Sequence, residues 1–172
     1  MATTPTLLNS CAKATTAAEA RFRIDAPIAP SRATRVVALD EEATAVVRRV
    51  ADDAWASARF FTCDSRLHAS GSNGASADGL PLLAMDGSAA VLGEQLAGAD
   101  VAVMVATTDD GAAAASAIGA VCTLRGIMTA GLVLSDGIDV AAALSALRPH
   151  ARVLLVPAEE EDLSELLRAL RA

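Results

Sequence analysis

Residues 100–134 read DVAVMVATTDDGAAAASAIGAVCTLRGIMTAGLVL, and this stretch decides the fold. Val101–Ala106 is a run of six apolar residues, the length of a buried strand. An acidic turn follows, and then small residues over Ala112–Arg125 with Gly126 just beyond them, which is typical of a helix and its C-terminal cap. A second apolar run occupies 127–134. The order strand, helix, strand predicts a βαβ unit of a parallel sheet.

The same alternation continues on both sides of this unit. It predicts a Rossmann-like α/β domain over residues 34–172, a doubly wound, mostly parallel sheet of about five strands with helices on both faces. Residues 1–33 contain three prolines and no sustained periodicity, so we expect a flexible or docking N-terminal arm. Further strands are predicted at 35–39, 59–63, 81–85 (a short edge strand) and 152–157. Helices are predicted at 41–58, 88–96, 140–147 and 162–171, and a loop is predicted at 65–80.

Composition limits the partners of the domain. The 172 residues carry a net charge of −7, and 53% of them are hydrophobic. Residues 1–35 hold five Lys or Arg against two Asp or Glu, and the remaining residues hold nine against nineteen. An acidic domain repels phosphate backbones, so nucleic acid is not expected as a partner. The sequence has no apolar run long enough to span a bilayer, and we expect a cytoplasmic protein without membrane contact.

The cysteines and histidines do not predict a metal centre. Cys11, Cys63 and Cys122 are far apart and form no CxxC pair, and neither His68 nor His150 has a Cys or His nearby in sequence. Cys63 and Cys122 sit in apolar surroundings, which is typical of inert core thiols. No catalytic triad is recognisable, and we expect neither a cofactor nor a bound metal.

In doubly wound folds, ligands bind beyond the carboxyl ends of the strands. Asp and Glu follow three of the predicted strands, and hydroxyl residues lie beside them. Two interpretations are open: a crevice for a small ligand or cation, or carboxylates that cap the first turns of helices. The crevice hypothesis would use Asp40, Thr107, Thr108, Asp109, Asp110, Gly111 and Ser135.

The order and wording of the segments resemble the nucleotide-binding domain of the tubulin/FtsZ family. There, a Gly-Ala-Asp triplet precedes an apolar strand, a glycine-rich phosphate loop and a helix follow, and a G-x-x-T sequence leads into the next strand. The last strand of that domain ends in an Ile-Pro sequence. The corresponding residues here are 98–100, Val101–Ala106, 107–114, the helix to Arg125, 126–129 and VLLVP at 153–157. The resemblance covers about residues 35–160.

This sequence differs from that family at the residues that bind and hydrolyse the nucleotide. Its GGGTGTG signature holds a triphosphate through backbone N–H groups, but the matching residues 109–115 read DDGAAAA, and the turn after the first strand reads DEEAT at 40–44. A carboxylate about 4 Å from a phosphate costs on the order of 4 kcal/mol, or roughly a thousandfold in affinity. The family's base-recognising asparagine is replaced by Ala158, and we expect no counterpart of its second domain, which carries the catalytic loop. The resemblance therefore implies a module that has lost GTP binding and hydrolysis.

Two functions follow as hypotheses. The first is a non-enzymatic FtsZ-like module that acts through protein contacts, as a homodimer or as a subunit of a larger assembly. The second is a small-ligand or cofactor-binding protein, or an enzyme, that uses the acidic strand-end crevice.

Overall fold

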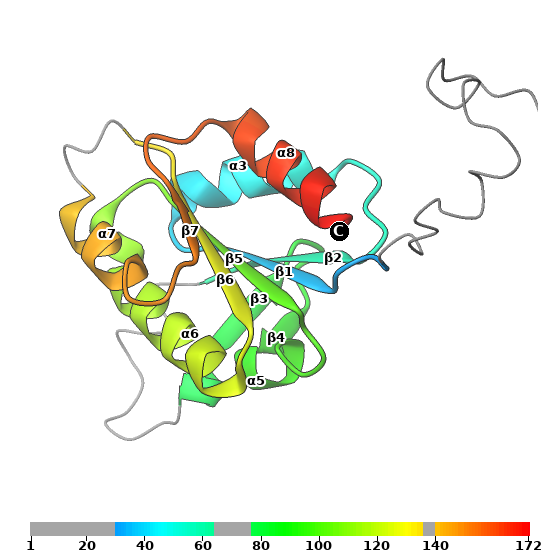
Figure 1. Ribbon diagram of the computed structural model, residues 1–172, viewed down its shortest axis with the longest axis horizontal. Helices are drawn as coiled ribbons and strands as arrows, with labels where there is room; N and C mark the ends of the chain where they lie inside the picture. The colour runs from blue at the N-terminus through cyan, green and yellow to red at the C-terminus, as the bar shows by residue number, and fades with distance from the viewer. Residues whose placement is uncertain (1–29, 64–76, 136–139) are drawn as a thin grey trace, which may run out of the picture.

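The computed structural model describes residues 30–63, 77–135 and 140–172 (Figure 1). Most of the predicted arm at 1–33 and of the predicted loop at 65–80 lies outside these residues. One sheet contains β1 (Thr34–Ala38), β2 (Ala58–Thr62), β3 (Pro81–Ala84), β4 (Ala89–Val91), β5 (Val101–Ala106), β6 (Met128–Val133) and β7 (Val153–Leu155). The helices are α3 (Glu41–Ala51), α5 (Leu92–Gln95), α6 (Ala112–Arg125), α7 (Ala141–Leu147) and α8 (Glu160–Leu170), with 3-10 turns η1 (Ala77–Gly79) and η2 (Asp109–Gly111).

The sheet runs in the order β4-β3-β2-β1-β5-β6-β7. Strands β2, β1, β5, β6 and β7 are parallel, and in chain order they follow the 2-1-3-4-5 arrangement of doubly wound folds. The predicted α/β class is thereby confirmed. In the described residues the sheet has seven strands rather than about five. β3 agrees with the strand predicted at 81–85, whereas β4 was not predicted, and the two form an antiparallel hairpin beside β2. The outermost strand on that side is β4, not β3 as we expected for 81–85.

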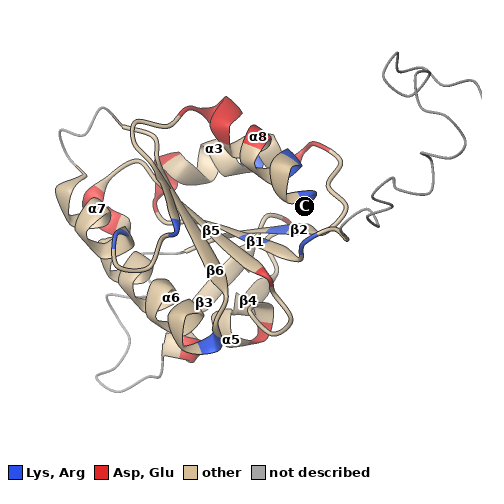
Figure 2. Ribbon diagram, viewed as in Figure 1, with Lys and Arg blue, Asp and Glu red and all other residues tan. Residues whose placement is uncertain are grey.

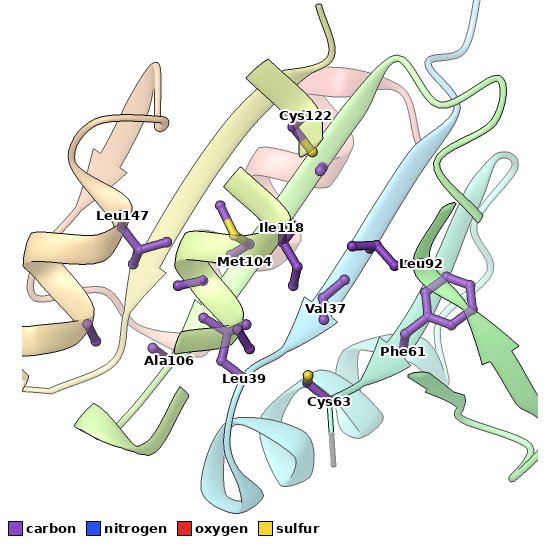
Figure 3. Packing of buried hydrophobic residues seen from close by; sticks show 14 of the residues in the cluster. Val37, Leu39, Phe61, Cys63, Leu92, Met104, Ala106, Ile118, Cys122 and Leu147 are labelled. Carbon is purple, nitrogen blue, oxygen red and sulfur yellow. The ribbon is translucent and has the colours of Figure 1, made fainter. Parts of the chain in front are cut away.

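Alternate residues of the central strands enter two separate cores. Val37 of β1 and Met104 of β5 pack with Ile118 of α6 on one face of the sheet, as Figure 3 shows. On the other face, Val36 and Val103 pack with α3 and α8. Central parallel strands need apolar side chains on both faces, which explains the unbroken apolar run of β5. Helices on both faces confirm the doubly wound prediction (Figure 1).

Two predicted helices differ from the structure. The helix predicted at 41–58 ends at Ala51, where the chain turns towards β2 and the indole of Trp55 donates a 2.7 Å hydrogen bond to the carbonyl of Val50. The helix predicted at 88–96 is instead β4 followed by the single turn of α5. The cause is the turn at Asp86 and Gly87. The Asp86 carboxylate accepts from the Ser88 backbone N–H at 2.8 Å, Gly87 adopts a φ of 84°, and the chain reverses into a hairpin.

Candidate functional site at the ends of β1 and β5

The switch point of the sheet lies between β1 and β5, where the chain leaves towards helices on opposite faces. From β1 it enters α3, and from β5 it enters η2 and α6. Doubly wound proteins bind ligands at such a point, because the loops diverge and leave a crevice between them. Six of the seven predicted site residues lie in these two loops; Ser135 follows β6.

Asp40 is the centre of this region, and the residue is only 6% exposed. One carboxylate oxygen accepts from the Ala43 backbone N–H at 2.8 Å, which caps α3, and also from the Thr107 hydroxyl. The other oxygen accepts from the backbone N–H groups of Thr107, at 2.7 Å, and Thr108, at 3.1 Å. The carboxylate therefore joins the start of α3 to the turn after β5.

These donors are of the kind that hold a bound anion in other doubly wound proteins. In such proteins, backbone N–H groups at the start of a helix and in a neighbouring strand-to-helix turn form a concave site for phosphate. Here three such N–H groups, those of Ala43, Thr107 and Thr108, point at the protein's own carboxylate. An anionic ligand would have to displace Asp40 to reach them.

Asp109 also has a structural role. Its carboxylate accepts from the Ala143 backbone N–H at 2.8 Å and so contacts the first turn of α7. Thr108 caps η2 through a 3.4 Å bond from the Asp110 N–H, while Asp110 itself is exposed. The capping interpretation thus describes Asp40, Thr108 and Asp109.

Gly111 is required by packing against β1. A Cβ atom built at this position would lie 2.4 Å from the Cβ of Leu39 and 2.7 Å from its carbonyl oxygen. The glycine lets the start of α6 approach the end of β1 closely. This contact accounts for the one glycine in residues 109–115 without reference to a phosphate.

An open cavity of about 460 Å³ remains beside this network. Its rim is acidic, and no lining residue is Lys or Arg. Among the residues that the structure describes, no group of three or more His, Cys, Asp or Glu is placed to hold a metal ion. The cavity is lined by Asp40, Glu41, Glu42, Ala45, Thr108 and Asp110.

The remaining candidates do not take part in the hydrogen bonds around Asp40. Ser135 is half-buried at the edge of the described residues and makes no hydrogen bond to the other six. Cys63 and Cys122 are buried, and burial raises the pKa of the Cys122 thiol to about 11, which agrees with an inert core thiol. His150 forms a 3.0 Å hydrogen bond with Thr123 and lies against α6, away from the carboxyl ends of β1 and β5.

Sequence reasoning missed two hydroxyls that extend the network. Thr44 donates to the carbonyl of Asp40 at 2.8 Å, and its oxygen lies 2.7 Å from the hydroxyl of Thr62 at the end of β2. A signal for this contact was present. Thr44 stands one helical turn after the cap residue, and Thr62 stands at the end of the neighbouring strand.

Comparison with known proteins adds little. No protein-family model matches the chain, and no curated protein matches it. A solved structure from Burkholderia pseudomallei K96243, described as pilus assembly-related, superposes with a TM-score of 0.46 at 17% identity. The match covers 85% of this chain and 95% of that one. This likeness is too weak to bear on function. Within the described residues, no helix is long and apolar enough to cross a membrane.

Proposed function

We propose that this protein is a non-enzymatic Rossmann-like module that acts through protein–protein contacts, with copies of itself among its partners. The observation that carries the proposal is Asp40. Its carboxylate accepts from three backbone N–H groups of the kind that would bind a ligand phosphate, and it is buried while it does so.

Electrostatics support the same proposal. A nucleotide that entered the switch point would meet Glu41, Glu42 and Asp110 around the cavity, with no cationic lining residue. Each close carboxylate–phosphate contact costs on the order of 4 kcal/mol. On the tubulin/FtsZ resemblance described above, we propose that acidic residues replaced the two phosphate loops of an ancestral nucleotide site.

A thermal-shift panel tests this function. The full chain is heated with GTP, GDP, ATP, NAD, FAD, coenzyme A, Mg²⁺, Mn²⁺ and Ca²⁺, each at millimolar concentration. A ligand at a hundred times its Kd stabilises the folded state by about 2.7 kcal/mol, which gives a clear rise in Tm. We expect no rise with any of them.

A rise with a nucleotide would overturn the proposal. A rise with a cation or cofactor that disappears in Asp110→Asn would favour the ligand-binding crevice instead. Asp86→Asn is the matched control, because it removes an exposed carboxylate from the β3–β4 turn, away from the crevice.

A further inference from the structure

The two helical layers of the protein differ in surface charge (Figure 2). Helix α3 carries Glu41, Glu42, Arg48 and Arg49, and α8 begins with three consecutive acidic residues. Helix α6, the longest of the described helices, carries a single charged residue, Arg125 in its last turn, and α7 carries none. Helices α3 and α8 therefore carry many charges, whereas α6 and α7 carry one between them.

The outward face of α6 is largely uncharged. Ala113, Ser116, Ala120, Thr123 and Leu124 are exposed on this helix, and Ala117 between them is half-buried. Leu124 is 88% exposed, whereas the other exposed large hydrophobic residues, such as Val153, lie near 40%. Apart from the hydroxyl residues Ser116 and Thr123, the side chains of this face are small or apolar. An apolar helix face is normally covered by another part of a structure.

The spacing along this face is symmetric. Positions 113, 117, 120 and 124 are separated by four, three and four residues, so they form one stripe of the helix. The sequence of spacings is the same in both directions. If two such helices lie antiparallel with the midpoint between 118 and 119 on a two-fold axis, Leu124 of each faces Ala113 of the other. Ala117 then faces Ala120. Each large side chain meets a small one, which is the self-complementarity of a two-fold interface.

We propose that α6 packs antiparallel against α6 of a second copy of this chain, with the two-fold axis between Ala117 and Ala120. The proposal rests on the function proposed above and specifies its surface and partner. Alanines at the crossing allow the helix axes to approach to about 8 Å, the short end of helix packing. The exposed residues of α7, Ala141, Ala142 and Ser145, continue the uncharged surface beside α6.

Charge favours a second copy on this face. Two molecules of net charge −7 repel each other, and the repulsion is least where neither presents a charge. Antiparallel packing also sets the opposite ends of the two helix dipoles side by side. The Arg125 guanidinium at the end of α6 bonds the Asp78 carboxylate of its own molecule at 2.8 Å, so its charge is already paired.

The available area suits a dimer of modest affinity. The fourteen residues of α6 extend over about 21 Å, and α7 packs alongside them. Two adjacent helices offer a face of the order of 20 Å by 20 Å, below the roughly 800 Å² per partner of a standard stable interface. A dissociation constant in the micromolar range is the expectation.

A charge placed at the axis tests the contact. Sedimentation equilibrium of the full chain should show a monomer–dimer equilibrium, and Ala120→Glu should weaken it about a hundredfold, because two carboxylates then face each other near the axis. Ala169→Glu is the matched control. It makes the same substitution at an exposed alanine of α8 and, at a salt concentration that screens the added charge, should leave the equilibrium unchanged. A monomer at all concentrations, or equal effects of both variants, would overturn the proposal.

Cysteine cross-linking tests the orientation. In the antiparallel pair, the two copies of position 120 are offset by about 4.5 Å along the axis, and the two copies of position 113 by about 16 Å. Ala120→Cys should therefore form a disulfide-linked dimer on mild oxidation, and Ala113→Cys should not. Equal cross-linking of both variants would indicate parallel helices and contradict the symmetric arrangement. Unchanged melting temperatures would establish that both variants fold.

These outcomes separate the two proposals. A monomer that gives no ligand-induced rise in Tm would refute the α6 contact and the self-association in the proposed function, and would leave a module that contacts a different protein. A nucleotide-induced rise in a protein that still dimerises through α6 would refute the proposed non-enzymatic function and leave the contact in place.

Discussion

Asp40 illustrates, for a single residue, how one side chain closes a site that the fold provides. Its carboxylate satisfies donors from α3 and from the turn after β5, and those donors would otherwise be left unpaired at a largely buried position. A buried donor without a partner costs about 1–3 kcal/mol. The residue is therefore a structural link as well as the feature that excludes an anion.

Replacing Asp40 tests this role. Asp40→Ala removes the cap of α3 and leaves the N–H groups of Thr107 and Thr108 without an acceptor, so we expect the free energy of unfolding to fall by about 2–4 kcal/mol. Urea unfolding followed by circular dichroism measures the change. Asp110→Ala, at an exposed carboxylate two residues beyond Thr108, should change it by less than about 0.5 kcal/mol. Equal losses would show that Asp40 has no special linking role.

Cys122 makes stability depend on pH in the alkaline range. Burial raises the pKa of its thiol from about 9 to about 11, and Arg125 offsets only part of that rise. The unfolded chain loses this proton near pH 9, while the folded chain keeps it until about pH 11. The stability that the protonated thiol contributes is therefore fully present below pH 9. As pH rises from 9 to 11, the free energy of unfolding decreases by about 2 kcal/mol.

The composition makes this titration easy to isolate. The chain has no tyrosine, and Lys13 is its one lysine, so few other groups titrate between pH 9 and 11. Urea unfolding at several pH values should give a steeper decline for the natural protein than for Cys122→Ala. Parallel curves would contradict the prediction. Iodoacetamide at pH 8 should label Cys122 only after unfolding.

Among the predicted site residues, sequence reasoning found where they lie but not what they do. Parallel strands end at one edge of a sheet, so the residues that follow β1 and β5 were expected to meet, and Asp40 does bond Thr107 and Thr108. Sequence gives no side-chain direction, however. Asp109 could therefore be named as a crevice residue although its carboxylate contacts α7.

At the level of elements, the strong periodic segments were predicted well. The bounds of β5 and α6 agree with prediction, because one is a continuous apolar run and the other ends at Gly126, whose φ is 68°. In the hairpin, β3 was predicted at 81–85, but β4 was missed. This second strand contains alanine and leads into a leucine, a composition that also suits a helix, and only the Asp86-Gly87 turn signals the reversal.

Packing between α6 and the segment after α7 gives a prediction at the same scale. A Cβ atom at Gly119 would lie 2.3 Å from the Cδ2 atom of His150, so α6 approaches this ring only because residue 119 is glycine. Gly119→Ala should reduce the free energy of unfolding by about 1–3 kcal/mol through overpacking. Gly79→Ala is the control, since a Cβ atom there meets nothing within 4 Å and its φ is ordinary. A stabilising Gly119→Ala would contradict this packing.

The whole molecule combines a negative net charge with one uncharged helical face, and the two features together determine how its self-association responds to salt. If the copies meet through α6 and α7, attraction comes from apolar contact, while long-range repulsion comes from the net charge of −7 on each copy. Salt screens the repulsion and leaves apolar contact almost unchanged. The dimer should therefore become tighter as salt increases.

We expect the dissociation constant to fall several-fold between about 20 mM and 200 mM NaCl, over which the Debye length shortens from roughly 20 Å to 7 Å. Sedimentation equilibrium at a series of salt concentrations measures it. Ala169→Glu adds one negative charge per copy on the charged face and should steepen the dependence slightly without changing the limit at high salt. An interface held by ion pairs between the charged helices α3 and α8 would respond in the opposite direction, because salt weakens such pairs. A dimer that dissociates as salt rises would therefore place the contact on that face.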